Sequence, residues 1–174
     1  RATRVVQALL TAGKEYVCIM HLHKPVEKAE LEKALKEFTG KIMQMPPVKS
    51  AVVRKERERE IYYLDILEIE DQDVLFRMGS QAGTYVRKLC HDVGKRLNVG
   101  AHMAELIRTK AGPFVAKDWV SLQDLEDAYA FWKEGNEKFI RHCVKPVEFA
   151  VNHLPKIWIQ DSAIDTVCHG ASLS

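Results

Sequence analysis

Residues 83–94 read Gly-Thr-Tyr-Val-Arg-Lys-Leu-Cys-His-Asp-Val-Gly, and residues 100–109 read Gly-Ala-His-Met-Ala-Glu-Leu-Ile-Arg-Thr. The first stretch opens the clearest helical pattern in the chain. We therefore predict a helix over 85–97, with Thr84 as its N-cap after Gly83. The apolar residues recur at the i, i+3, i+4, i+7 and i+11 spacing of one helix face, and they are Val86, Leu89, Cys90, Val93 and Leu97.

Arg87 stands apart on this helix, because it lies in the first turn and off the apolar stripe. A cation there is disfavoured by the positive end of the helix dipole. The position therefore suggests an anionic partner, either a carboxylate or a phosphate. An ordinary surface ion pair is an equally good interpretation of this residue on physical grounds alone.

Strands and further helices are predicted on both sides of this helix. The run 15–22 is short, β-branched and aromatic, and it lies between Gly13 and Pro25, as is typical of a buried strand. Strands over 60–70 and 74–78, joined by the turn 71–73, predict a hairpin. Segment 46–59 is interpreted as a loop or a loosely paired ribbon. Helices are expected over 1–12, 27–39, 121–132 and 135–144, a strand over 156–160, and a domain boundary near 150–155.

Composition is that of a globular protein. Of the 174 residues, 47% are hydrophobic and 29% are charged, which excludes disorder and low complexity. No apolar run approaches the ~18 residues of a membrane helix. The four cysteines stand singly, which suits unpaired thiols in a reducing, intracellular compartment. Because the chain opens on Arg1 without a methionine, we expect it to be an internal piece of a longer protein.

Charge is nearly balanced overall at +2 but is unevenly distributed. Residues 49–59 carry a net charge of +3 and residues 85–110 a net charge of +4, whereas 60–73 hold six acids and no base. Basic segments beside aromatic residues can grip a phosphate backbone while a ring stacks on a base. The stretch 49–59 follows Pro46-Pro47 and has no regular pattern, so it is a candidate RNA-contacting loop. Ordinary surface charge is the alternative.

Patterns for metal, hydrolytic or nucleotide-cofactor chemistry are missing from the sequence. There is no Gly-x-Ser-x-Gly, no P-loop and no Gly-x-Gly-x-x-Gly. Cys18 and His21 would point to opposite faces of a strand. His21 and His23 would share a face, but no third ligand has a matching spacing. We therefore expect no metal and no cofactor.

Several motifs, taken together and in order, resemble those of one enzyme family. The segments 83–87, 92–94 and 100–106 resemble the C-terminal catalytic motif of TruB-family pseudouridine synthases, and Lys-Glu-Tyr at 14–16 resembles that family's tyrosine motif. The resemblance covers essentially the whole chain. Within this family, the chain resembles the archaeal and eukaryotic, dyskerin-like branch, whose members are the catalytic subunits of H/ACA ribonucleoproteins. The segments that carry this narrower resemblance are 44–51, 132–135, 153–158 and 161–163.

The resemblance implies isomerisation of uridine to pseudouridine in RNA by a catalytic aspartate, without metal or cofactor, on a nucleotide that has left the helical stack. It implies that Tyr16 stacks on the target base and takes part in proton transfer. Arg87 would pair with the catalytic aspartate, and Tyr85 and Leu106 would flank the flipped base. Segment 46–59 would close over substrate RNA. The candidate RNA-binding residues are the basic residues of this segment, Lys49, Arg54, Lys55 and Arg57, together with Arg108.

The same resemblance implies an α+β fold with a mixed, largely antiparallel sheet and flanking helices. Residues 1–152 would be a partial catalytic domain, and 153–174 the start of a small, β-rich PUA domain that holds guide RNA. The implied partners are guide RNA, substrate RNA and small accessory proteins of an H/ACA ribonucleoprotein, with no membrane. The implied compartment is the cytoplasm in an archaeon and the nucleolus in a eukaryote.

Two departures from the family pattern bear on activity. The family's catalytic aspartate lies in a Gly-Thr-Leu-Asp-Pro-type motif shortly before the segment that resembles 1–4, and the chain lacks that motif. Where the family usually has Leu-Arg-Arg, residues 106–108 of this chain read Leu-Ile-Arg. We expect this difference to remove one basic side chain from the RNA-binding face. We therefore expect the chain alone to be inactive. The alternatives are a stand-alone synthase for the tRNA T-loop and a non-catalytic RNA-binding scaffold.

Overall fold

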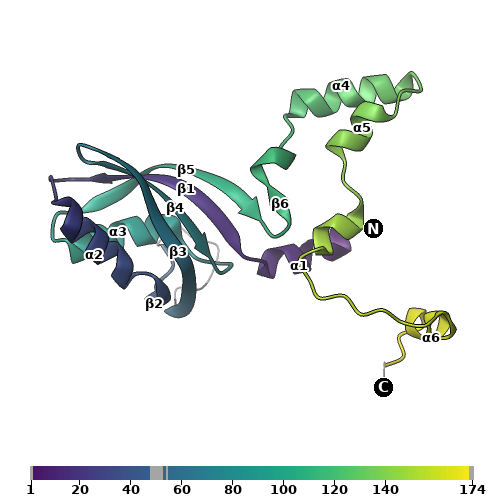
Figure 1. The fold of residues 1–174 in the computed structure, drawn as a ribbon, viewed down its shortest axis with the longest axis horizontal. Helices are drawn as coiled ribbons and strands as arrows, with labels where there is room; N and C mark the ends of the chain where they lie inside the picture. Colours follow the sequence, from purple (N-terminus) through teal and green to yellow (C-terminus); the bar gives the residue numbers. More distant parts are fainter. Residues whose placement is uncertain (1, 48–52, 54, 173–174) are drawn as a thin grey trace.

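A six-stranded antiparallel sheet, with strand order β2-β3-β4-β1-β5-β6, forms the centre of the molecule (Figure 1). The structure is a computed structural model that describes residues 2–47, 53 and 55–172. The predicted α+β class with a largely antiparallel sheet is confirmed. The strands are β1 (Lys14–Leu22), β2 (Gly40–Gln44), β3 (Arg57–Glu70), β4 (Asp73–Ser80), β5 (Ala101–Ala111) and β6 (Phe114–Val115).

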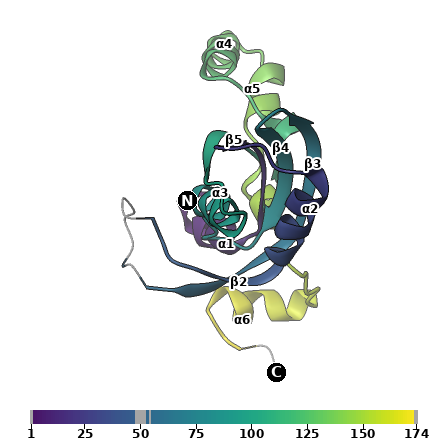
Figure 2. The ribbon, with the colours of Figure 1, turned by 90° about the vertical axis from the view of Figure 1, so that its left-hand side faces the viewer.

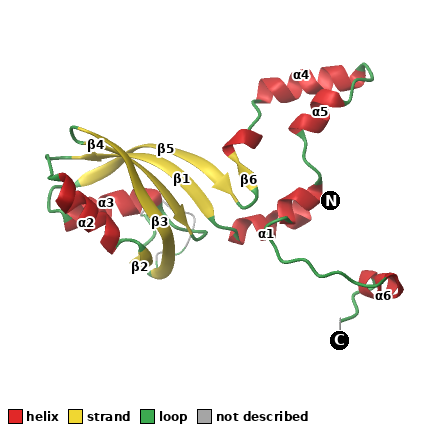
Figure 3. Ribbon diagram, in the orientation of Figure 1, coloured by secondary structure: helices red, strands yellow, loops and turns green. Residues whose placement is uncertain are grey.

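Helices α2 (Lys28–Glu37) and α3 (Val86–Arg96) cover one face of the sheet, which curls around α3 (Figure 2). Helices α4 (Leu122–Lys133) and α5 (Lys138–Cys143) pair with each other away from the sheet (Figure 3). The other helices are α1 (Val6–Thr11), α6 (Ile164–Cys168) and the 3-10 turns η1 (Ala2–Val5), η2 (Ala116–Asp118), η3 (Val147–Val151) and η4 (Asp161–Ala163). Among the described residues, none of these helices is long and apolar enough to cross a membrane.

The hydrophobic core lies between the covered face of the sheet and helices α2 and α3. Side chains of a strand alternate between the two faces of its sheet, so Cys18, Met20 and Leu22 of β1 share the covered face, and all three are buried. The apolar stripe predicted for 85–97 meets them, and each of its members is buried. This contact fixes α3 across the middle of the sheet.

Gly94 allows α3 and β5 to lie close together. A Cβ atom on Gly94 would lie 2.1 Å from the backbone nitrogen of Ala101, which no side chain can tolerate. The Gly94 carbonyl also accepts hydrogen bonds from the amides of Val99 and Gly100, at 3.1 and 3.0 Å. The chain reverses through Asn98 and Gly100, whose φ angles are 57° and 78°. The two halves of the motif quoted above are thereby brought together.

The structure corrects three expectations about local structure. Thr84 is not the N-cap of α3: Tyr85 occupies that position, and the Thr84 hydroxyl donates to the Gln81 carbonyl at 2.8 Å. Residues 57–59 belong to β3 rather than to the preceding loop, because they pair with β2. Residues 156–160 form no strand, since no described strand lies beside them to share backbone hydrogen bonds. The described residues after 152 are helical or irregular.

Candidate active site

Tyr16, Tyr85, Arg87 and Leu106 line a single cavity of about 290 Å³. They come from β1, the residue before α3, the first turn of α3, and β5. All four of the pocket residues named from the resemblance are therefore brought together by the fold. Sequence reasoning did not name the remaining lining residues as pocket residues, and they are Pro47, Thr84, Val86 and Met103.

Tyr16 reaches this cavity because of the alternation along β1. It lies two residues before Cys18, on the sheet face that α3 covers, and it packs against the buried core. Across the sheet, Tyr16 pairs with Met78 on β4 and with Arg108 on β5. The phenol ring is therefore held on a rigid strand rather than on a loop.

Glu15 anchors the same part of β1 on the opposite face. Its carboxylate accepts hydrogen bonds from the hydroxyl of Tyr63 on β3 at 2.5 Å and from that of Thr109 on β5 at 2.7 Å. These bonds lower the pKa of Glu15. Burial, followed by the bond to Glu15, raises the pKa of Tyr63 to about 12. Strands on both sides of β1 are thus tied to the residue next to Tyr16.

Gln44 fixes the backbone at the start of α3. Its Oε1 accepts from the Tyr85 amide at 2.8 Å, and its Nε2 donates to the Tyr85 carbonyl at 3.1 Å. The Gln44 side chain is buried. Both hydrogen bonds act on the residue that caps the helix, so they set the position of Tyr85 and, two residues further on, of Arg87. Sequence reasoning missed this role.

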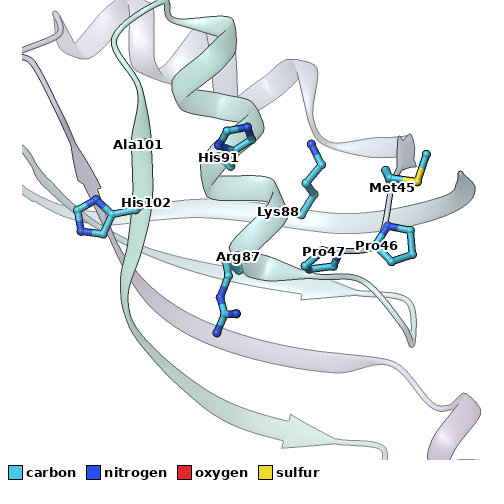
Figure 4. A pocket seen from close by; sticks show the side chains of 8 residues that line it. All are labelled: Met45, Pro46, Pro47, Arg87, Lys88, His91, Ala101 and His102. Carbon is cyan, nitrogen blue, oxygen red and sulfur yellow. The ribbon is translucent and has the colours of Figure 1, made fainter. Parts of the chain in front are cut away.

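Arg87 is exposed, and none of the ion pairs between described residues includes it. Figure 4 shows its guanidinium pointing away from the axis of α3. Of the two interpretations made from the sequence, the ordinary surface ion pair is therefore not formed within the described part of the chain. The guanidinium is available to an anion.

Of the predicted RNA-binding residues, the three that the structure describes, Lys55, Arg57 and Arg108, do not line the cavity. Lys49 and Arg54 lie outside the described residues. Lys55 is exposed and lies just before β3, and Arg57 is the exposed first residue of that strand. Arg108 is exposed and pairs with Tyr16.

Ile107, which stands at the first arginine of the family's Leu-Arg-Arg, pairs with Val17 on the sheet face opposite Leu106. The replaced residue therefore does not lie on the sheet face that carries Tyr16. The guanidinium of Arg59, in contrast, is used within the fold, since its Nε donates to the Gly83 carbonyl at 3.1 Å.

Cysteine and histidine side chains gather in two places. The sulfur atoms of Cys18 and Cys90 lie 3.8 Å apart in the core, and this contact, together with burial, raises the pKa of the Cys90 thiol. His23 and His102 share a hydrogen bond of 3.0 Å, with the His21 ring beside them. His102 is the third imidazole that the sequence spacing did not reveal. Among the described residues, no group of three or more such side chains is arranged to hold a metal ion.

Comparison with known proteins agrees with this geometry. The family described as "tRNA pseudouridylate synthase B C-terminal domain" matches residues 87–152, and the family "Pus10, C-terminal" matches residues 3–112. Proteins named "Probable tRNA pseudouridine synthase B" match all of this chain, with 58% identity in Methanopyrus kandleri and 59% in Methanothermobacter thermautotrophicus. The matches cover 52% and 54% of those proteins. The chain thus spans about half the length of the curated relatives it matches.

Solved structures match over nearly the whole chain. A crystal structure of a Cbf5-Nop10-Gar1 complex matches with a TM-score of 0.93 and 55% identity, over 98% of this chain and 53% of the other. An H/ACA ribonucleoprotein bound to a substrate RNA containing 2'-deoxyuridine matches with a TM-score of 0.88 and 52% identity, over 98% of this chain and 51% of the other. With the family match over residues 3–112 and these likenesses together, the chain belongs to the TruB family of pseudouridine synthases and lies in its dyskerin-like branch, with the archaeal Cbf5 proteins.

Proposed function

We propose that this chain is part of an enzyme that isomerises uridine to pseudouridine in RNA, as the catalytic subunit of an H/ACA ribonucleoprotein. The observation that carries the proposal is the cavity that joins Tyr16, Tyr85, Arg87 and Leu106. A stacking ring, an unpaired guanidinium and an apolar side chain around one space suit a nucleobase that has left its helix.

The proposed chemistry needs a carboxylate that residues outside this chain supply, from a Gly-Thr-Leu-Asp-Pro-type motif. Arg87 pairs with that carboxylate and keeps it ionised and oriented. The bond between N1 of uracil and C1′ of ribose breaks, the base rotates against the ring of Tyr16, and C5 bonds to C1′. The proton on C5 is then removed and N1 gains one, so the product is an isomer. The Tyr16 hydroxyl takes part in this proton transfer.

The substrate of the proposed enzyme is ribosomal RNA, selected by pairing with a guide RNA. The similar solved structures contain Nop10, Gar1 or a substrate RNA, and we infer partners of the same kind for this protein. In this proposal residues 1–152 belong to the catalytic domain and 153–174 open a PUA domain. The enzyme then works where the ribonucleoprotein does, in the cytoplasm of an archaeon or the nucleolus of a eukaryote.

A second candidate substrate is transfer RNA, because the relatives are named as tRNA pseudouridine synthases. The two candidate substrates can be distinguished by whether their modification requires a guide RNA. If the protein is guided, isomerisation of an rRNA fragment needs the matching guide RNA. If it works alone, a tRNA T-loop is modified without any guide or accessory protein.

The direct test is nearest-neighbour analysis of uridine-labelled RNA. We expect pseudouridine from the full-length enzyme with its guide RNA and none from the 174-residue chain alone, since an essential catalytic group cannot be replaced by the remaining parts. Substituting the upstream aspartate by alanine in the full-length enzyme should likewise abolish pseudouridine formation. Robust product from the isolated chain would overturn both the role of that aspartate and the proposal that this chain is only a part of the enzyme.

A further inference from the structure

A second cavity, larger than the first, lies beside the outer surface of α3. Its volume is about 430 Å³, within the range of small-molecule binding sites. One side is the segment Met45–Pro47, which leads out of β2, and the other side is the start of β5. Figure 4 shows that α3 forms the floor with three successive side chains along its length, Arg87, Lys88 and His91.

The two cavities adjoin each other. Arg87 and Pro47 line both of them, so the guanidinium stands at the boundary. A chain molecule with one unit in the first cavity therefore places its next unit at the entrance of the second, and the link between the units passes beside Arg87. RNA is such a molecule, with a phosphate at each link.

The lining of the second cavity has two chemical characters. Pro46 and Pro47 give it a flat apolar wall. Facing them, Lys88 is about one-quarter exposed and is ion-paired with Asp92 one turn later, while His91 is exposed and has no hydrogen bond to any described residue. The His102 ring lies on the far side of the β5 ribbon from His91 (Figure 4) and shares a hydrogen bond with His23. A purely apolar ligand would leave the cations unused, and a small anion would leave the prolines uncovered.

We propose that this cavity binds the nucleotide next to the isomerised uridine in the same RNA strand. The base lies between the Pro46-Pro47 wall and the His91 ring, and the phosphate that joins the two nucleotides lies beside Arg87 and Lys88. The inference rests on the proposed function, since the first cavity must hold the target uridine. It adds a binding site for a second nucleotide, whose lining residues other than Arg87 and Pro47 lie outside the first cavity.

The test compares RNA binding and single-turnover isomerisation by the full-length enzyme for intact RNA and for two RNAs that lack one base, either just 5′ or just 3′ of the target. The variants are His91→Ala and Lys88→Ala, with Lys95→Ala as the control, because Lys95 is an exposed cation on the same helix outside both cavities. Circular dichroism confirms folding, and His91→Gln replaces His91→Ala if that variant fails to fold.

We expect the wild-type enzyme to bind one of the two abasic RNAs about tenfold more weakly than intact RNA, the size of one base contact. His91→Ala should bind intact RNA about tenfold more weakly and show no further loss with that abasic RNA. Lys88→Ala should reduce the salt slope of binding by about 1. Lys95→Ala should keep the wild-type abasic penalty.

An unchanged abasic penalty in His91→Ala, or no penalty at either position in the wild-type enzyme, would overturn the second-nucleotide site. Such a result alongside normal isomerisation of intact RNA would leave the proposed function standing. The absence of any isomerisation of intact, guide-matched RNA by the wild-type enzyme would instead overturn the proposed function itself.

Discussion

The side-chain amide of Gln44 pairs with the backbone of Tyr85 through two hydrogen bonds, of 2.8 and 3.1 Å, and so joins the end of β2 to the N-cap residue of α3. Few side chains can satisfy a backbone N–H and its own carbonyl at once, because this requires a donor and an acceptor in one planar group. Gln44 is therefore a positioning residue for Tyr85 and Arg87, although it does not line their cavity.

Replacing this amide should disturb both stability and turnover. Gln44→Ala leaves the Tyr85 amide without its partner, while the Tyr85 carbonyl keeps the hydrogen bond from the Leu89 amide at 3.0 Å. We expect the change to lower the free energy of unfolding by about 1–3 kcal/mol. Turnover of the full-length enzyme should fall even under conditions where the variant is fully folded. Gln123→Ala, at an exposed position on α4, serves as the control for both measurements. Normal single-turnover rates in Gln44→Ala would show that the start of α3 needs no such support.

Gly94 should resist any side chain. Gly94→Ala places a methyl group against the backbone of Ala101, so α3 and β5 must separate. Overpacking of this kind typically costs about 1–3 kcal/mol, and here the obstacle is backbone that cannot rotate away. Urea unfolding of Gly94→Ala should therefore show a clear loss of stability. The neighbouring exposed change Lys95→Ala should stay within about 0.5 kcal/mol of the wild type.

The hydrogen bond between Glu15 and Tyr63 should make stability depend on pH at both extremes. The pKa of Glu15 is lowered in the folded state, so its contribution is present above the ordinary value and is lost as the pH falls through the folded value. The pKa of Tyr63 is raised from 10.0 to about 12, so its contribution is present below 10.0 and is lost as the pH rises toward 12.

Tyr63→Phe should remove the alkaline part of this dependence and weaken the acidic part, because Thr109 still donates to Glu15. Thermal unfolding at several pH values, for the wild type and for Tyr63→Phe, measures both effects. Tyr62→Phe is the matched control, since Tyr62 is exposed. Parallel stability curves for the wild type and Tyr63→Phe between about pH 10 and 12 would contradict the assigned role.

Basic side chains near the start of β3 should contribute to RNA affinity through counterion release. Changing Arg54, Lys55 and Arg57 together to alanine should weaken substrate binding and flatten the salt slope by about 2, at roughly 0.7–0.9 per phosphate contact. Folding stability should change little, because exposed substitutions usually stay within about 0.5 kcal/mol. Binding measured over a range of potassium chloride concentrations decides this, and an unchanged slope would mean that these charges only solvate the strand edge.

Periodicity in the sequence predicted helix α3, because its stripe from Val86 to Leu97 packs against a single core. Strand β1 was predicted instead from its β-branched and aromatic residues and from its place between Gly13 and Pro25, and the structure confirms both elements. Strand β5 gave no such signal, since most of its residues are exposed on both faces. Segment 156–160 has strand-forming residues but no neighbouring strand among the described residues, so propensity alone gave the wrong prediction.

The candidate site was predictable only through the resemblance. Tyr16, Tyr85, Arg87 and Leu106 are spread over three elements, and no spacing rule brings them into one cavity. The dipole argument singled out Arg87, but it could not name the anion. Gln44 was beyond reach because its role depends on contact with a backbone far along the chain, which leaves no local pattern. The hydrogen bond between His23 and His102 could not be predicted for the same reason.

The central claim is that Tyr16 and Arg87 act together on one uridine, and single-turnover pseudouridine formation by full-length variants tests it most directly. Arg87→Ala should abolish turnover while circular dichroism and RNA binding show a folded, RNA-binding protein, because the carboxylate loses the cation that orients it. Tyr16→Phe should keep base stacking but lose the hydroxyl, and Tyr16→Ala should lose both, so neither variant should turn over normally. Near-normal pseudouridine formation by Arg87→Ala would contradict the account.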